Sequence, residues 1–293
     1  MAWKSIADLI VADGPADVAL IGAPMEAGSV TPGRCDLAPE TIRRTLRRFS
    51  SYDVVTGAEL DLRILDAGDV GVKGVMPADG FEPIVEAVRR CTAAHGLTIL
   101  LGGNNAVTRP AVHALGVPLA EVGLITLDAH FDLRETDQGL LNGNPIRALL
   151  EDGLPGANIS QIGLAPFANT AKMHRDAQDA GIGVWTIADC RKVGMVPILK
   201  EALARLAHTA AMIVDFDIDV IDRSQCPGAP GARPGGMPVD MFLEAARFLA
   251  AEPRVRLVDL TEFDPSLDLS DITALTAARW VCDILAGFSS RQG

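Results

Sequence analysis

Short apolar runs alternate with amphipathic stretches along the whole chain, and this alternation constrains the fold more than any other feature. Most of the runs place apolar residues on both faces, as strands buried on both faces require. Eight runs are predicted to be strands, at 18–22, 62–66, 98–101, 123–127, 158–162, 183–186, 211–216 and 255–260. Helical periodicity is found at 39–49, 81–95, 145–151, 169–180, 196–207 and 239–250. The pattern predicts a three-layer α-β-α fold, in which helices cover a doubly wound, mostly parallel sheet of about eight strands.

No linker, repeat or low-complexity tract interrupts the alternation, so residues 1–293 are predicted to form a single domain. Asp and Glu number 38 against 26 Lys and Arg, which gives a net charge of −12. This excess of acid argues against a general nucleic-acid or anionic-membrane binder, because phosphate binding needs clustered basic residues. We expect a cytoplasmic protein with reduced thiols, since the five cysteines are scattered and neither a signal peptide nor a long apolar span is recognisable.

Two of the predicted strands end in acidic clusters with a spacing of two. The sequence Asp-Ala-His-Phe-Asp occupies 128–132, and Asp-Phe-Asp-Ile-Asp occupies 215–219. In extended backbone this spacing places side chains on one face, and ligands of such sheets bind at the carboxyl ends of the strands. Either cluster alone could be a solvated surface loop, but acids that close a buried strand repel one another without a cation.

Taken together, the two clusters deliver five aspartates and one histidine to one edge of the sheet. Such a set needs about two divalent cations, and its oxygen-rich composition suits Mn²⁺ better than Zn²⁺. Two cations can activate a water molecule as a nucleophile near neutral pH. The residues therefore predict a hydrolase.

The same residues carry a family resemblance. The stretch 214–236, with Asp217, Asp219, Pro-Gly at 227–228 and Gly-Gly at 235–236, resembles the second signature of the ureohydrolases, which include arginases, agmatinases and formimidoylglutamases. The stretch 128–132 resembles their Asp-Ala-His-x-Asp motif. Weaker matches at 22–24, 101–103 and 262–265 extend the resemblance over almost the whole chain. It implies an arginase-like fold and a homo-oligomer, either a trimer or a hexamer.

The resemblance also implies the role of each residue in a two-ion Mn²⁺ centre. Asp128 and Asp217 would bridge the ions, while His130 and Asp219 would complete the first ion's shell. The second ion would have Asp132. Glu262 matches the acid that holds the amidinium group of the substrate. Asp132 and Glu262 are the predicted catalytic residues.

Three positions depart from the family pattern. Asn105 stands where a histidine usually serves the second ion, and a neutral amide oxygen is a weaker donor than imidazole for Mn²⁺. We therefore expect Asn105 to be a metal ligand in a weak second site. The loop 141–146 lacks the histidine that arginases use for proton transfer, and Arg223 replaces a proline.

Smaller details resemble formimidoylglutamase more than arginase, among them Asn-Gly-Asn-Pro at 142–145 and Ala-Pro-Phe-Ala-Asn-Thr at 165–170. Asn142, Asn144, Arg134, Arg147 and Glu262 are the predicted substrate contacts. The two arginines could pair with carboxylates of an acidic substrate, although Arg147 reads equally well as an exposed helix residue.

These features predict a metal-dependent hydrolase of a linear amidine, with formimidoylglutamate as the first substrate and glutamate and formamide as products. An agmatinase, arginase or guanidino-acid hydrolase that releases urea is the alternative. A second alternative is a catalytically degenerate member of the family that acts as a binding or regulatory subunit, because one metal ligand and the proton-transferring histidine are absent.

Overall fold

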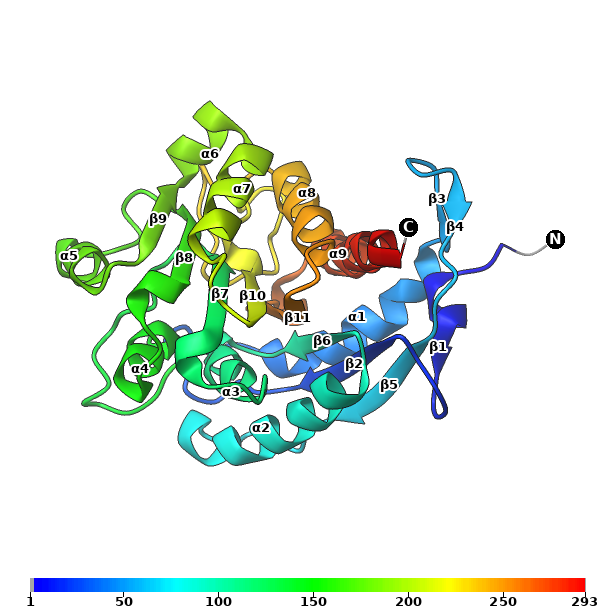
Figure 1. Ribbon diagram of the computed structural model, residues 1–293, viewed down its shortest axis with the longest axis horizontal. Coiled ribbons are helices and arrows are strands. Elements are labelled where there is room, and N and C mark those ends of the chain that lie inside the picture. Colours follow the sequence, from blue (N-terminus) through cyan, green and yellow to red (C-terminus); the bar gives the residue numbers. More distant parts are fainter. Residues whose placement is uncertain (1–2, 293) are drawn as a thin grey trace.

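The computed structural model describes residues 3–292 and is built around one nine-stranded sheet (Figure 1). Its order is β1-β5-β2-β6-β11-β10-β7-β8-β9, and all neighbouring strands are parallel. The strands are β1 (Ile10–Val11), β2 (Val18–Ala23), β5 (Ile64–Asp69), β6 (Leu97–Gly102), β7 (Val122–Leu127), β8 (Ile159–Leu164), β9 (Gly183–Thr186), β10 (Ala211–Asp217) and β11 (Val255–Thr261). All eight predicted strands are present, so the predicted fold class is confirmed. The short β1 is a ninth strand that was not predicted.

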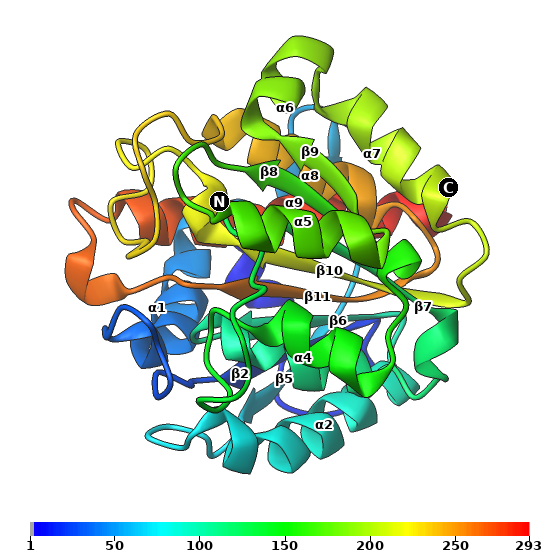
Figure 2. The same ribbon diagram turned by 90° about the vertical axis from the view of Figure 1, so that its left-hand side faces the viewer.

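Helices cover both faces of the sheet, and each face has its own apolar core (Figures 1 and 2). One face carries α1 (Ala38–Thr45), α6 (Ile187–Val193), α7 (Met195–Arg205), α8 (Val239–Ala250) and α9 (Ile272–Ser289). The other carries α2 (Pro77–Ala94), α3 (Thr108–His113), α4 (Pro145–Asp152) and α5 (Ala171–Ala180). An antiparallel hairpin of β3 (Tyr52–Asp53) and β4 (Ala58–Glu59) lies outside the main sheet.

Helix α9 has the length and apolar composition of a membrane-spanning helix, but 67% of that span is buried inside the protein. It packs between α1 and α8. Trp280 of α9 is completely buried, and its ring meets that of Phe216 on β10 edge-on at 5.3 Å. This helix is therefore a core element of the fold.

The chain order creates a crevice at the carboxyl edge of the sheet. Strands β6 and β7 are consecutive in the main sheet's chain order, but β11 and β10 separate them in space. The connections that leave the strand ends on either side of such a switch point diverge, and open α/β sheets bind ligands there. The predicted residues Asn105, Asp128, Asp217 and Glu262 all lie at or just beyond the ends of these four strands.

Candidate metal centre and substrate cleft

Strand register brings the acidic residues together. Strand β10 pairs with β7 up to residue 127 and with β11 up to residue 261. Asp128 and Glu262 therefore leave their strands on either side of Asp217, the last residue of β10. All three side chains are buried.

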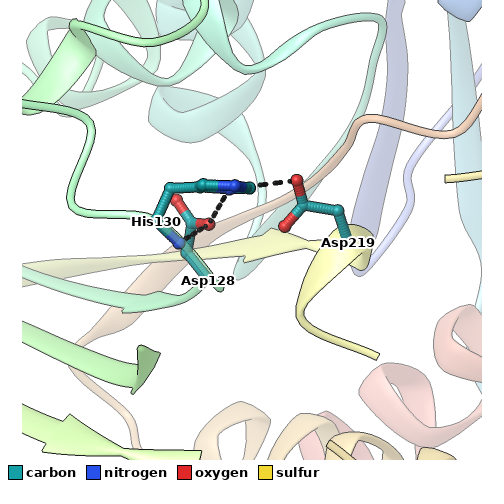
Figure 3. Close-up of side chains that lie close together, drawn as sticks. All are labelled: Asp128, His130 and Asp219. Carbon is teal, nitrogen blue, oxygen red and sulfur yellow. Dashed lines mark hydrogen bonds and ion pairs between the residues drawn. The ribbon is translucent and has the colours of Figure 1, made fainter. Parts of the chain in front are cut away.

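Three metal-type donors converge beside this edge (Figure 3). The ligand atoms of Asp128, His130 and Asp219 all lie within 4.8 Å of one another. Nδ1 of His130 lies 3.4 Å from Oδ1 of Asp128 and 3.2 Å from Oδ2 of Asp219. Oδ1 of Asp219 is buried and has no hydrogen-bond partner among residues 3–292. This donor set fits a divalent cation, which would satisfy the unpartnered oxygen and neutralise the carboxylates.

Burial and mutual repulsion shift the acidity of these groups. Burial raises the pKa of Asp128 to about 6 and holds those of Asp132 and Asp217 well above the ordinary value. The negative charge of Asp219 is the main cause that raises the pKa of His130 to about 12. Burial opposes ionisation of Asp219 too, but His130 lowers its pKa overall. Without a cation, the protons held on these groups therefore neutralise part of the negative charge of the site.

Asn105, the predicted ligand of the second ion, lies directly against Asp132. Its Nδ2 donates a hydrogen bond of 2.6 Å to Oδ2 of Asp132. Its Oδ1 accepts bonds from Thr108 at 2.7 Å and Thr261 at 3.2 Å. In this arrangement the amide nitrogen, rather than the predicted oxygen donor, faces Asp132. Coordination by Asn105 would require the amide to turn over, so that Nδ2 instead of Oδ1 faced the two threonine hydroxyls.

Glu262 is held in one orientation at the floor of the cleft. Its Oε1 accepts bonds from the backbone N–H of Asn105 at 2.8 Å and from Nδ2 of Asn142 at 2.9 Å. Burial raises its pKa to about 7, although the Asn142 bond lowers it. Its backbone has φ of 62°, a left-handed conformation that is uncommon for a residue with a side chain and often marks a functional site.

A cleft of about 210 Å³ opens above these groups. Four acids line it: Asp132, Asp217, Asp219 and Glu262. The other lining residues are His130, Asn142, Asn169, Arg134, Arg233, Thr31, Val30, Phe167, Ala168, Met173, Gly143 and Gly231. Of the predicted substrate contacts, Glu262, Asn142 and Arg134 thus reach the cleft.

Two predicted substrate contacts do not line the cleft. Arg147 forms an ion pair with Asp176 and also donates to a backbone carbonyl. Asn144 is fully buried, and its side chain bonds the backbone of residues 135, 139 and 141. Both side chains stabilise the loop and helix that follow Asp132, so their placement gives no support to direct substrate contact.

Sequence reasoning gave no site role to several residues that line the cleft, among them Phe167, Asn169 and Arg233. Phe167 is fully exposed with φ of 62°. Asn169 locks the loop around His130, because it accepts from the N–H of Phe131 and donates to the carbonyl of Ala129. Two of these residues lie within the 165–170 motif and the third within 214–236, so motif membership was the available signal.

The fold and this donor set define a class of protein: a three-layer α/β protein with a carboxylate-rich candidate metal site at the sheet edge. Residues 16–287 match the model of the Arginase family. Formimidoylglutamase of Halalkalibacterium halodurans is 34% identical over 92% of this chain and 86% of that protein. The chain therefore belongs to the arginase family.

Solved structures agree with this assignment. The crystal structure of Bacillus subtilis formimidoylglutamase has a TM-score of 0.92 and 29% identity, over 98% of this chain and 92% of that one. A crystal structure of Trypanosoma cruzi formiminoglutamase with Mn²⁺ has a TM-score of 0.91 and 22% identity, over 99% of this chain and all of that one. A fold of this kind is thus known to hold Mn²⁺.

Proposed function

We propose that this protein hydrolyses formimidoylglutamate to glutamate and formamide. The observation that carries the proposal is the placement of Glu262 beside the metal-type donors. Both of its hydrogen bonds from Asn105 and Asn142 go to Oε1, so Oε2 is left to pair with an amidinium group. The similarity to formimidoylglutamases supports this substrate over other amidines.

The chain's own side chains would share the work as follows. Asp128 and Asp217 would bridge two Mn²⁺ ions, His130 and Asp219 would complete the first site, and Asp132 would serve the second. Bound Mn²⁺ would activate water for attack on the amidine carbon. Glu262 would hold that carbon in line, which removes much of the entropic cost of the reaction. Asp132 and Glu262 remain the proposed catalytic residues.

A substrate panel tests this proposal. Purified protein with Mn²⁺ should release formamide and glutamate from formimidoylglutamate, with kcat/KM at least about tenfold higher than for any guanidino compound, a difference of ~1.4 kcal/mol. Agmatine, arginine and 4-guanidinobutyrate form the rest of the panel, with urea as the product measured. Preferential release of urea would favour the agmatinase, arginase or guanidino-acid alternative.

The catalytically degenerate alternative rests on Asn105 and on the missing proton-transferring histidine. Against it, the buried donors Asp128 and Asp219 remain clustered with His130, and a site without a cation gains nothing from buried carboxylates that repel one another. No turnover of any amidine with Mn²⁺, Co²⁺ or Ni²⁺ would favour the degenerate alternative.

We also propose a cytoplasmic homo-oligomer, either a trimer or a hexamer. The hairpin between β3 and β4 supports subunit contact, because Val54 and Val55 at its tip are 81% and 75% exposed. Exposed apolar side chains that lie together often mark protein interfaces. Light scattering coupled to size-exclusion chromatography should give three or six times the mass of one chain. A monomer would contradict this assembly.

A further inference from the structure

The cleft has a strong division of charge. Its acids, Asp132, Asp217, Asp219 and Glu262, are all buried, whereas Arg134 and Arg233 are exposed. A ligand that fits this arrangement has one end that is cationic or can bind a metal, next to the acids, and an anionic end next to the arginines. An amidine of an acidic amino acid has both.

Arg233 is held close to the metal-type donors by its own loop. A Cβ added to Gly231 would lie only 1.9 Å from Oδ2 of Asp219, so this backbone packs directly on the acid. Nη1 of Arg233 donates to the carbonyl of Gly231 at 2.8 Å, and also to those of Ala232 at 3.1 Å and Pro230 at 3.4 Å. Within residues 3–292, its Nε and Nη2 have no such partner. Part of the guanidinium fork therefore remains for a ligand.

Arg134 reaches the same cleft from another strand end. It lies two residues after Asp132, and its backbone N–H donates to the carbonyl of Gly143 at 3.1 Å. Its side chain packs over Gly143, where an added Cβ would lie 2.8 Å from its Cδ and 2.9 Å from its Nε. In the described part of the chain, the guanidinium of Arg134 has no hydrogen bond or ion pair. The neighbouring Arg147, by contrast, is already paired with Asp176.

From this layout we infer that Arg134 and Arg233 each bind one carboxylate of a substrate that carries two. The inference rests on the proposed function and deepens it, because it assigns Arg233 a role in specificity and divides the two carboxylates between Arg134 and Arg233. Guanidinium groups suit this task, since their planar fork matches a carboxylate with two hydrogen bonds. Loss of one arginine should weaken recognition of one carboxylate and leave recognition of the other intact.

The experiment compares Arg134→Ala and Arg233→Ala on three substrates. These are formimidoylglutamate, N-formimidoyl-4-aminobutyrate, which lacks the α-carboxylate, and N-formimidoyl-2-aminobutyrate, which lacks the γ-carboxylate. Each variant should lose roughly ten- to a hundredfold in kcat/KM on formimidoylglutamate, mostly through KM. Each should lose little on the one analogue that lacks its carboxylate, and the two variants should tolerate different analogues.

Further variants separate binding from charge and folding. Arg44→Ala removes one exposed positive charge outside the cleft lining and should leave all three rates unchanged. Arg233→Lys keeps the charge without the fork and should lose less than Arg233→Ala. Equal losses of Arg134→Ala and Arg233→Ala on all three substrates, or no loss, would overturn the inference.

A binding measurement keeps this test apart from the test of the proposed function. Calorimetry of glutamate on the Mn²⁺-loaded protein needs no turnover, and both alanine variants should bind it roughly ten- to a hundredfold more weakly. If the unaltered protein binds glutamate but does not release formamide, only the proposed function fails. If it releases formamide and both variants bind glutamate normally, only the inference fails. No binding of glutamate by the unaltered protein would also overturn the inference.

Discussion

At the residue scale, we propose that Asn105 sets the affinity of a second metal site. Asp132 receives a hydrogen bond from this amide at 2.6 Å, so Asn105 presents a donor and not a ligand atom to it. Loss of one good ligand commonly costs a few kcal/mol, and each 1.4 kcal/mol or so is about tenfold in affinity. The second ion should therefore bind far more weakly than the first.

Asn105→His should correct this imbalance. After dialysis against Mn²⁺-free buffer, the unaltered protein should retain closer to one ion per chain and the variant closer to two, measured by elemental analysis. Activity of the unaltered protein should rise with added Mn²⁺, and that of the variant should depend on it less. Two equally tight sites in the unaltered protein would show that Asn105, or another residue, is an adequate ligand.

Single site residues were predictable where a metal-type side chain comes directly after the end of a strand. Asp128 and Asp217 lie within one position of such an end, so the rule for sheet edges predicts that they meet. Glu262 also lies there, but it was singled out by the family resemblance. Asn144 and Arg147 depend on how a loop folds back on itself, and spacing in the sequence says nothing of that. Phe167 also escaped prediction, because its left-handed backbone is decided by the tertiary environment.

At the scale of elements, the segment between β10 and α8 forms one wall of the metal centre. Gly231 of this segment packs against two donors, since an added Cβ would lie 1.9 Å from Oδ2 of Asp219 and 3.2 Å from Cε1 of His130. Only glycine allows the backbone so close.

Gly231→Ala should therefore displace Asp219 and weaken Mn²⁺ binding by about tenfold or more, the equivalent of ~1.4 kcal/mol. The metal-free protein should keep most of its stability, because the displaced atom is the end of a side chain. Gly71→Ala is the matched control, since nothing lies within 4 Å of its added Cβ. Isothermal titration with Mn²⁺ measures the difference. Unchanged affinity in Gly231→Ala would mean that Asp219 is not a ligand or can shift without cost.

Helices and strands were predictable from the sequence when their apolar residues follow the period of that kind of element. Most of the eight long strands place apolar residues on both faces, and helices such as α8 have one apolar face. Helix α9 was not predicted, because it is buried on most sides and its polar face is only a narrow stripe formed by Thr276, Arg279 and Asp283. Strand β1, with two residues, is too short for any periodicity to appear.

At the scale of the whole molecule, the buried acids link stability to pH and to metal. In the metal-free protein the pKa values of Asp128, Glu262 and Asp259 are raised to about 6, 7 and 7, chiefly by burial. The native state then holds protons that the unfolded chain releases above its own pKa of about 4. By linkage, the free energy of unfolding falls as pH rises through this window. The raised pKa of His130 acts in the same direction above pH 6.5.

The metal-free protein should accordingly be more stable to urea at pH 5.5 than at pH 7.5. Saturating Mn²⁺ should reverse this order, because the cation competes with protons for the same groups and binds better at higher pH. Urea unfolding at the two pH values, with and without Mn²⁺, measures both effects. A metal-free protein that gains stability from pH 5.5 to 7.5 would contradict the placement of these acids in the core.

The central claim is that acids at one sheet edge hold Mn²⁺ for amidine hydrolysis, and proton NMR of the products of formimidoylglutamate tests it most directly. With Mn²⁺, the unaltered protein should produce formamide and glutamate in equal amounts. Asp217→Ala should produce neither and retain no Mn²⁺, because the proposed bridge serves both ions, whereas Asp240→Ala, an exposed acid of α8, should match the unaltered protein. Formamide release by Asp217→Ala at the unaltered rate, or by the unaltered protein after complete removal of metal, would contradict the account.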